Sequence, residues 1–270
     1  MRADLYLFTY GHTKSRQSAK TLIENEKIKI DGAKITKPSF EIDEDAEHTV
    51  EITERQKFVS RGGEKLDFAL DRFKIDVKGL LAIDVGASTG GFTDCLLQRG
   101  ARTVYAVDSG HSQLDASLEE DERVVSIEKY NARLMTEEDF SVSFDIAVMD
   151  VSFISQTYIH RGLSSVLKDG GIFISLIKPQ FEAGRSALNS KGVVKKASYH
   201  MQAVLRVIDS ALICGFSCID IIPSPIEGGS GNVEFLAYFV KSEKPVNHVS
   251  ENKIKTITKA KQNKLALHNT

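Results

Sequence analysis

The chain has 270 residues, of which 41% are hydrophobic and 27% charged, and its formal net charge is −2. This composition is typical of a globular protein, and the length predicts one large domain or two unequal ones. No run of about 18 apolar residues occurs, which excludes a helix that spans a membrane, and the charged N-terminus is unlike a secretory signal. Three scattered cysteines predict neither a disulfide framework nor a zinc site, so we expect a reduced, cytoplasmic protein without a metal.

Charge is distributed unevenly along the chain. Residues 1–40 carry eight Lys/Arg and four Asp/Glu, whereas residues 41–54 carry seven acids and no Lys/Arg. Residues 241–270 carry seven Lys and two Glu. A basic head and a basic tail therefore flank a larger body, and we expect the tail from residue 246 to be flexible. The acidic stretch predicts the solvated face of a strand or turn.

The head predicts a small α+β unit over residues 1–58. Its pattern indicates a short helix over 2–10, a second helix that Ser15 caps, and a β-hairpin over 27–36 with an Asp-Gly turn. Four cations share the outer side of the second helix or one strand face: Arg16, Lys20, Lys27 and Lys29. Such clustering suits an RNA phosphate backbone, and solvated side chains are the alternative.

The order of helix, helix and hairpin, with SRQSAKTLI followed by IKIDGAKITKP, resembles an S4 domain. This small module binds structured RNA mainly through shape and phosphate contacts, so the resemblance implies RNA binding by the head. We expect a polar linker over residues 59–64, with helical periodicity resuming at Leu66. Two further arginines are predicted RNA contacts: Arg61 in the linker, and Arg185 in a basic patch near the cleft with Lys191, Lys195 and Lys196.

From residue 80, apolar runs alternate with amphipathic segments. The apolar runs are 80–85, 103–107, 124–127, 144–149 and 172–177, and the helical segments include 91–98, 159–167 and 199–214. This alternation is the signature of a doubly wound parallel sheet. Two last runs, 218–222 and 233–240, enclose a turn-rich segment that predicts a closing hairpin. We therefore predict an α/β, Rossmann-like domain over residues 65–245.

The first apolar run ends in a glycine-rich loop, DVGASTGG, that an acid leads. Ser88 replaces the second glycine of a dinucleotide fingerprint, and Asp84 would repel a pyrophosphate. A second acid, Asp108, closes the next strand. Two acids suit the cationic, phosphate-free S-adenosylmethionine better than NAD, although an NAD-dependent oxidoreductase and a plain tight turn are alternatives. The predicted cofactor contacts are Asp84, Gly86, Ala87, Ser88, Gly90, Gly91, Asp108 and Asn131.

Three charged residues end apolar runs where a doubly wound sheet has its ligand-binding edge: Asp150, Lys178 and Glu234. Charged residues are rarely buried unless they are paired, so three at one edge predict a functional cluster, with satisfied surface charges as the alternative. A lysine held between two carboxylates can orient a ribose 2′-hydroxyl and stabilise the alkoxide that develops. Phe153 and Phe181 are predicted to be packing residues rather than platforms for base stacking.

Six segments occur in order along the body: VSRGGEKL, DVGASTGGFTDCLL, MDVSFIS, IKPQFEAGR, KGVV and SGNVEF. Together with the S4-like head, they resemble the TlyA (haemolysin A-like) family of rRNA 2′-O-methyltransferases, whose catalytic domain is similar to the FtsJ/RrmJ type. That family uses a Lys-Asp-Lys-Glu tetrad, and the matching positions here are Lys65, Asp150, Lys178 and Glu234. Only the resemblance singles out Lys65.

The resemblance implies S-adenosylmethionine as the cofactor and ribosomal RNA or ribosomal subunits as the partner. Family members methylate cytidine 2′-hydroxyls in small-subunit rRNA, and some also in large-subunit rRNA. No metal, membrane or obligate protein partner is expected. Two other functions stay open: a haemolysin or pore-forming protein, as the historical family name suggests, and a non-catalytic ribosome-assembly factor, against which the intact tetrad argues.

Overall fold

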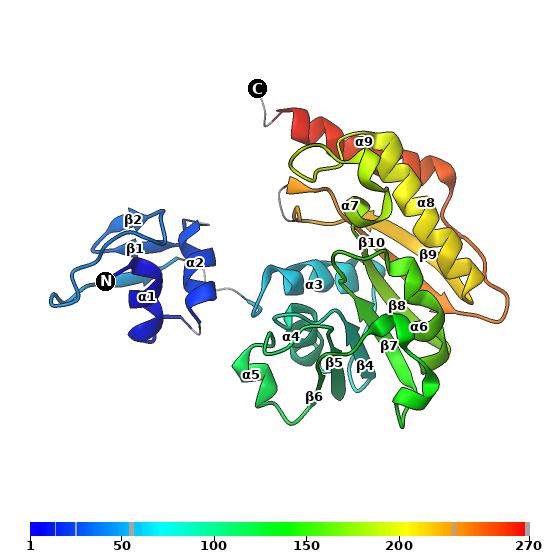
Figure 1. Cartoon of the computed structure of the whole chain (residues 1–270), viewed down its shortest axis with the longest axis horizontal. Helices are drawn as coiled ribbons and strands as arrows, with labels where there is room; N and C mark the ends of the chain where they lie inside the picture. The colour runs from blue at the N-terminus through cyan, green and yellow to red at the C-terminus, as the bar shows by residue number, and fades with distance from the viewer. Residues whose placement is uncertain (14, 25, 54–56, 229–230, 268–270) are drawn as a thin grey trace. The chain divides into compact units, whose positions relative to one another are not determined.

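The computed structural model describes residues 1–13, 15–24, 26–53, 57–228 and 231–267, with side chains as far as residue 259. The chain divides into two compact units, Met1–Ser60 and Arg61–Thr270, which are drawn in Figure 1. The predicted boundary after residue 58 therefore lies within two residues of the observed one.

The first unit combines two helices with a three-stranded antiparallel sheet of order β2-β1-β3. Its elements are α1 (Ala3–Thr9), α2 (Arg16–Glu24), β1 (Ile28–Ile30), β2 (Ala33–Ile35) and β3 (Val50–Ile52). The two predicted helices and the hairpin are confirmed. Ser15 caps α2 by accepting the Ser18 backbone N–H at 3.1 Å. The hairpin turn places Asp31 and Gly32 in the left-handed region, with φ of 51° and 76°, as a type I′ turn requires.

The second unit begins with α3 (Arg61–Phe73), so most of the predicted linker over 59–64 is helical. The sequence pattern hid this start because two glycines, which are poor helix formers, stand in the first turn. Tertiary packing overrides that preference: Gly63, Lys65 and Leu66 are buried, and α3 packs against α4 (Gly91–Gln98). Residues 54–56 of the polar connection lie outside the described part of the chain.

The second unit is built on a seven-stranded sheet of order β6-β5-β4-β7-β8-β10-β9. Its strands are β4 (Leu81–Val85), β5 (Thr103–Val107), β6 (Val124–Ile127), β7 (Phe144–Met149), β8 (Leu167–Ile177), β9 (Phe216–Pro223) and β10 (Phe235–Lys241). The first five pair in parallel, whereas β10 is antiparallel to both β8 and β9. The predicted closing hairpin is confirmed, and β10 returns between β8 and β9. Strand β8 begins at Leu167 rather than at the predicted residue 172. Its first residues include the polar Lys168 and Asp169, so they were not part of an apolar run.

Helices cover both faces of this sheet, α3 and α4 on one side and α6 and α8 on the other (Figure 1). Besides α3 and α4, the helices of the unit are α5 (Ala116–Glu119), α6 (His160–Val166), α7 (Pro179–Glu182), α8 (Ala197–Ile213) and α9 (Glu251–Leu267). Short 3₁₀ turns are η1 (Ala132–Leu134), η2 (Glu137–Asp139), η3 (Gln156–Tyr158) and η4 (Arg185–Ala187). Fully buried aromatic rings fill the core around β8 and β10: Phe144, Phe173, Phe216, Phe235 and Phe239.

The tail predicted to be flexible from residue 246 is instead largely the helix α9, which packs against α8 and β9. Ile254 and Thr258, one turn apart, are buried in this contact, and Lys253 bonds to Asp220 of β9. The high density of lysines masked this narrow apolar face in the sequence. Residues 268–270 lie outside the described chain.

Among the described helices, none is both long and apolar enough to cross a membrane.

Candidate active site

A pocket of about 330 Å³ opens at the carboxyl ends of β4, β5 and β7. The strand order reverses there, with β5 on one side of β4 and β7 on the other, and open α/β sheets bind their ligands at such a point. Its walls include Gly86, Ser88, Asp108, Gln113, Tyr130, Asn131, Asp150, Ser152 and Phe153.

The glycine-rich loop after β4 is folded tightly against the neighbouring strand ends. Gly86 has φ of 85°, and a Cβ there would meet the main-chain oxygen of Asp150 at 2.9 Å, so only glycine allows this approach. Ser88 also takes a left-handed conformation, with φ of 48°. Its backbone N–H donates to Asp108 Oδ2 at 2.8 Å, and Gly110 N–H donates to Asp108 Oδ1 at 2.7 Å. Asp108 thus fixes two loops that border the pocket.

Asp84 is a fully buried carboxylate in β4. The Thr93 hydroxyl donates to its Oδ2 at 2.7 Å, whereas its Oδ1 has no hydrogen-bond partner among the described residues. The pKa of Asp84 is raised to about 7, mainly by burial; the Thr93 hydrogen bond opposes this shift, and the charges of Asp150 and Asp108 contribute to it. A carboxylate in this state favours a cationic ligand nearby and disfavours a phosphate.

The eight predicted cofactor residues separate into two groups. Gly86, Ser88, Asp108 and Asn131 line the pocket, whereas Asp84, Ala87, Gly90 and Gly91 do not. Asn131 also caps η1 by accepting the Arg133 backbone N–H at 3.2 Å. A Cβ at Gly90 would lie 2.3 Å from Leu118 Cδ1, so this glycine lets α5 pack against the loop. Ala87, Gly90 and Gly91 therefore shape the loop rather than the pocket wall, whereas Asp84 lies behind the wall in β4, where its charge is its means of acting on a ligand.

Lys178, directly after β8, meets the loop that follows β7. Its Nζ lies 2.5 Å from Asp150 Oδ1 and donates a hydrogen bond to Ser152 Oγ at 2.7 Å. Only 12% of the Lys178 side chain and 21% of the Asp150 side chain are exposed. The Lys178 ammonium is therefore held at the wall of the pocket, because its partners Asp150 and Ser152 both line it.

A second ion pair is buried more deeply. Lys65 of α3 donates from Nζ to Glu234 Oε2 at 2.6 Å, and only 2% of the Glu234 side chain is exposed. The side-chain amide of Gln180 donates to the other oxygen, Oε1, at 3.3 Å. A Cβ at Gly228 would lie 2.0 Å from that same oxygen, so the loop before Glu234 needs a glycine here. Residues 229–230 of this loop lie outside the described chain.

The prediction that Asp150 and Glu234 both flank Lys178 is wrong, because, of the two, only Asp150 forms an ion pair with it. The antiparallel register sets Phe235 opposite Ile177, which brings the backbones of Glu234 and Lys178 to neighbouring positions. Yet Lys178 pairs with Asp150, and Glu234 pairs with Lys65. The reason is that Lys65, which lies in α3, forms an ion pair with Glu234. The four predicted residues thus form two ion pairs, with Gln180, two positions after Lys178, contacting Glu234.

Phe153 is 93% exposed, which contradicts the expectation that it packs in the core or a loop. It has φ of 65°, lines the pocket beside Ser152, and its ring centroid lies 5.3 Å from that of Phe181. An apolar ring that a strained backbone holds in solvent at a pocket mouth suits contact with a ligand. The sequence offered one signal, the position of Phe153 within a strand-end loop.

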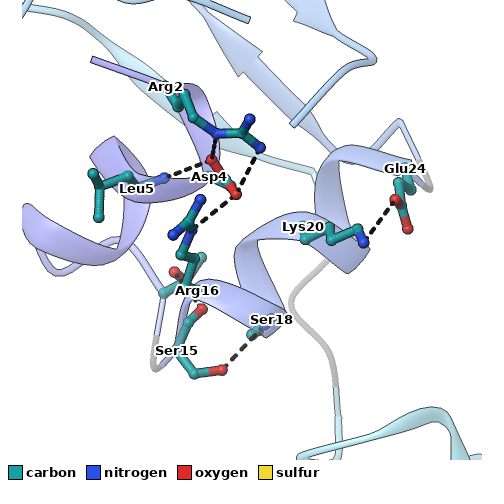
Figure 2. Close-up of polar contacts among 9 residues, drawn as sticks. Arg2, Asp4, Leu5, Ser15, Arg16, Ser18, Lys20 and Glu24 are labelled. Atoms are coloured by element: carbon teal, nitrogen blue, oxygen red, sulfur yellow. Dashed lines mark hydrogen bonds and ion pairs between the residues drawn. The ribbon is translucent and has the colours of Figure 1, made fainter. Parts of the chain in front are cut away.

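The predicted RNA contacts of the first unit are partly engaged within it. Figure 2 shows Arg2 and Arg16 converging on Asp4, with 2.9 Å from each Nε to the carboxylate. Only 3% of Asp4 is exposed, and the hydrogen bond from Arg2, with that from Arg16, lowers its pKa despite the burial. Arg16 therefore stabilises the fold of this unit, although 52% of its side chain is exposed.

The other predicted RNA contacts have solvent-accessible positions. Lys20 pairs with Glu24 at 3.8 Å (Figure 2) and Lys29 with Glu51 at 3.5 Å, both in exposed ion pairs that are worth little stability. Lys27, directly before β1, is half-buried. Arg61 at the start of α3 and Arg185 in η4 are exposed.

The residues that the structure describes contain no cluster of three or more His, Cys, Asp or Glu side chains that could hold a metal ion.

Two protein-family models match this chain. The model of the FtsJ-like methyltransferases matches residues 58–241, more than half of the chain. The chain belongs to the FtsJ-like methyltransferase family. A model of the S4 domain matches residues 1–48, so this FtsJ-like methyltransferase carries the S4 domain that the head resembles. The predicted fold class and family are both confirmed.

Curated relatives share both parts of the chain. Hemolysin A of Brachyspira hyodysenteriae is 40% identical over 241 residues, which cover 89% of this chain and 100% of that protein. The 16S/23S rRNA (cytidine-2′-O)-methyltransferase TlyA of Mycobacterium tuberculosis is 39% identical over 237 residues, or 88% of each chain. The solved structure of a Streptococcus thermophilus protein named as a hemolysin superimposes with a TM-score of 0.80 at 40% identity. It covers 99% of this chain and 98% of its own.

Proposed function

We propose that this FtsJ-like methyltransferase transfers a methyl group from S-adenosylmethionine to a ribose 2′-hydroxyl of ribosomal RNA, in cytidine. The observation that carries the proposal is the Lys178–Asp150 pair at the wall of the pocket, backed by the Lys65–Glu234 pair. Both curated relatives above extend over almost the whole chain, and the one from Mycobacterium tuberculosis is named for this reaction on 16S and 23S rRNA. A ribosomal substrate would place the enzyme in the cytoplasm.

The residues around the pocket fit the methyl donor. S-adenosylmethionine, when bound, supplies an electrophilic methyl group on a sulfonium centre. Its positive charges suit the buried Asp84, whose Oδ1 lacks a partner among the described residues. Asp108, Ser88 and Asn131 line the wall and would hold its polar groups. A pyrophosphate would meet the Asp84 charge instead, which disfavours NAD.

The reaction needs an oriented hydroxyl more than it needs a strong base. Lys178 Nζ, fixed by Asp150 and Ser152, presents a positive charge where a 2′-hydroxyl can be aligned and its developing negative charge stabilised. Lys65 donates to Glu234, and Glu234 accepts a hydrogen bond from Gln180, two residues after Lys178, so this second pair helps to fix the segment that carries Lys178. In this proposal all four tetrad residues are catalytic or directly supporting groups, and no metal takes part.

Isolated ribosomal subunits provide the test of this function. Purified protein, tritiated S-adenosylmethionine and each subunit should give labelled rRNA whose mark is a 2′-O-methylcytidine, read by mass spectrometry of nucleosides. Label on a base, or no label on either subunit, would contradict the proposal. Leakage of liposomes exposed to the same preparation would favour a pore-forming protein, and tight RNA binding without transfer would favour an assembly factor.

Affinity for the donor product should depend on pH through Asp84. Because the pKa of Asp84 is about 7, the free protein carries a neutral Asp84 at lower pH and a charged one at higher pH. S-adenosylhomocysteine keeps the ammonium group, so its Kd should rise as pH falls below 7, by up to about tenfold per pH unit. Calorimetry between pH 5.5 and 8.5 measures this Kd, because both limits lie about 1.5 units from the Asp84 pKa of about 7.

Asp84→Asn serves as the comparison. It should bind S-adenosylhomocysteine weakly at all pH values and remove the difference between low and high pH. Since the folded-state pKa is raised, the free energy of unfolding falls as pH rises from about 4 to 7, because the unfolded chain releases the Asp84 proton over this range while the folded chain keeps it. Asp84→Asn should therefore stabilise the ligand-free protein at pH 8. An identical pH profile for the two proteins would exclude this role.

The first unit should supply affinity for RNA and leave the chemistry to the second. A chain lacking residues 1–60 should bind S-adenosylhomocysteine as the full chain does but bind ribosomal RNA more weakly, most clearly at moderate salt, because fewer phosphate contacts are made. Filter binding across a salt series measures the loss. Lys20→Glu with Lys29→Glu, two exposed lysines, should reproduce part of it without truncation. Full methylation of rRNA by the shortened chain would contradict the assignment.

Phe153→Ala should lower the rate of methyl transfer to RNA about 10-fold or more, since stacking of a base on an aromatic ring contributes about 1–3 kcal/mol. The exposed ring at the pocket mouth motivates this expectation. Phe153→Tyr keeps the stacking surface and should retain most of the rate. Leu134, which is 73% exposed and lies in η1, provides a matched control, because Leu134→Ala removes an exposed apolar side chain that does not line the pocket. Equal effects of the two alanine variants would rule out stacking by Phe153.

A further inference from the structure

Glu182 is a buried carboxylate close to the candidate active site that the proposed reaction does not use. It is the last residue of α7, one helical turn after Lys178, and only 3% of it is exposed. It lies in the segment IKPQFEAGR, but nothing in the sequence pattern assigned it a role. Its contacts, however, all lead to segments that carry the reacting side chains.

Both carboxylate oxygens of Glu182 accept hydrogen bonds from the end of the loop after β7. The Ser155 hydroxyl donates to Oε2 at 2.6 Å, and the Gln156 backbone N–H donates to Oε1 at 2.9 Å. Ser155 is also the N-cap of η3, where its Oγ accepts the Thr157 N–H. The carboxylate therefore fixes the point at which this loop re-enters regular structure.

The same loop is attached to β8 on the other side of Lys178. The side-chain amide of Gln156 donates to the main-chain oxygen of Leu176 at 3.4 Å, and the Ser175 hydroxyl donates to Gln156 Oε1. Gln156 is 2% exposed and Ser175 is fully buried. The loop after β7 is thus joined to the chain both before and after Lys178, and the carboxylate provides the second of these joints.

These joints determine a geometry that Lys178 cannot set alone. A lysine side chain is long and flexible, so the place of its ammonium depends on where its partners stand. Asp150 and Ser152 belong to the loop that Glu182 holds, and Lys178 belongs to the segment that carries Glu182. We propose that Glu182 is a positioning residue, which locks this loop against the start of α7 so that Lys178 Nζ meets Asp150 and Ser152.

A purely structural role fits the chemistry of this position less well. Burial raises the pKa of Glu182, and the Ser155 and Gln156 donors and the charge of Arg206 offset only part of that shift, so the charged form is buried at a cost. The Arg206 guanidinium donates to the main-chain oxygen of Glu182 at 3.0 Å, and the donors to the carboxylate itself are the uncharged Ser155 and Gln156 groups. An apolar side chain would fill a buried position without that cost. What a carboxylate adds is two acceptors in fixed directions on one loop.

The inference rests on the proposed methyl transfer to RNA and is tested with Glu182→Gln in the full chain. An amide keeps the size of the side chain but replaces one acceptor by a donor. The single-turnover rate of transfer to ribosomal subunits should fall about 10- to 100-fold, because displacing a reacting group by about 1 Å can cost that much. The Kd of S-adenosylhomocysteine should change less than about threefold, since Gly86, Ser88 and Asp108 come from other strand ends.

The matched control is Asp145→Asn. Asp145 also holds a backbone N–H, that of Leu81 at 2.8 Å, and pairs with Lys168 at 2.6 Å, but it lies at the opposite edge of the sheet. It should lower the melting temperature while leaving the rate within about twofold of the wild-type rate. A merely structural Glu182 would behave as Asp145 does, and that result would overturn the proposal.

A double-mutant cycle supplies the second readout. If Glu182 acts through Lys178, then Glu182→Gln should lower the residual rate of Lys178→Ala by less than about twofold, since the group that it positions is already gone. Full multiplication of the two losses would overturn the proposal. Absence of transfer by the wild-type protein itself would instead refute the proposed function, so the two failures are distinguishable.

Discussion

Lys178→Ala is expected to lower the single-turnover rate of methyl transfer by about 10²–10³, the usual cost of losing one stabiliser of transition-state charge. The ammonium stands 2.5 Å from Asp150 and 2.7 Å from the Ser152 hydroxyl, so the substitution removes a positive charge that these two partners hold in place. The assay is transfer of a tritiated methyl group at saturating donor and ribosomal subunit, followed over one turnover.

Two measurements separate this loss from a failure to bind or fold. The Kd values of S-adenosylhomocysteine and of RNA should stay near those of the wild type. Lys178→Arg should also fail, because a planar guanidinium cannot occupy the place of a compact ammonium between the same two partners. Lys168→Ala removes an ion pair with Asp145 at the other edge of the sheet and should leave the rate unchanged. A near-normal rate for Lys178→Ala would refute the mechanism.

Lys65→Met is expected to lower the free energy of unfolding by about 3–5 kcal/mol, because it leaves Glu234 as an uncompensated buried charge. The Glu234 side chain is 2% exposed, and the amide of Gln180 is its other donor among the contacts above. Urea unfolding at pH 7.5, about three units above the usual glutamate pKa, measures the change. A loss below about 1 kcal/mol would mean that Glu234 is not held charged by Lys65.

The double variant Lys65→Met/Glu234→Leu distinguishes stability from function. Replacing both partners of a buried ion pair by apolar residues of similar size is often neutral or stabilising. We therefore expect the double variant to recover most of the lost free energy of unfolding. Its methyl transfer should stay low, because Gln180 loses the carboxylate that holds it beside Lys178. Recovery of transfer together with stability would show that the pair serves only folding.

The fold was largely predictable because its signals are local. Strands β5, β6 and β7 begin and end where apolar runs do, and α4 spans the predicted residues 91–98. Errors arose where local signals opposed the packing. Two glycines hid the start of α3, and a lysine-rich composition hid the buried face of α9, with Ile254 and Thr258 inside it.

The candidate site was predictable only where residues end strands. Parallel strands bring their carboxyl ends to one edge, so Asp108, Asp150 and Lys178 could be assigned to that edge from their positions alone. Lys65 could not be assigned in this way, because it lies on a helix and reaches a partner 169 residues away in sequence. Glu182 carried no local signal either, since its partners come from a loop that precedes it by a whole strand.

The order of the elements, the edge of the sheet where ligands bind and the residue types at that edge follow from local sequence patterns. Three features follow only from the folded chain: which cation pairs with which carboxylate, the full burial of Asp84 and the exposure of Phe153. Periodicity records the face of an element on which a side chain lies, but pairing and burial depend on distances and dielectric set by other elements. Lys178 pairs with Asp150 while Glu234 pairs with Lys65, which comes from α3, a helix distant in sequence.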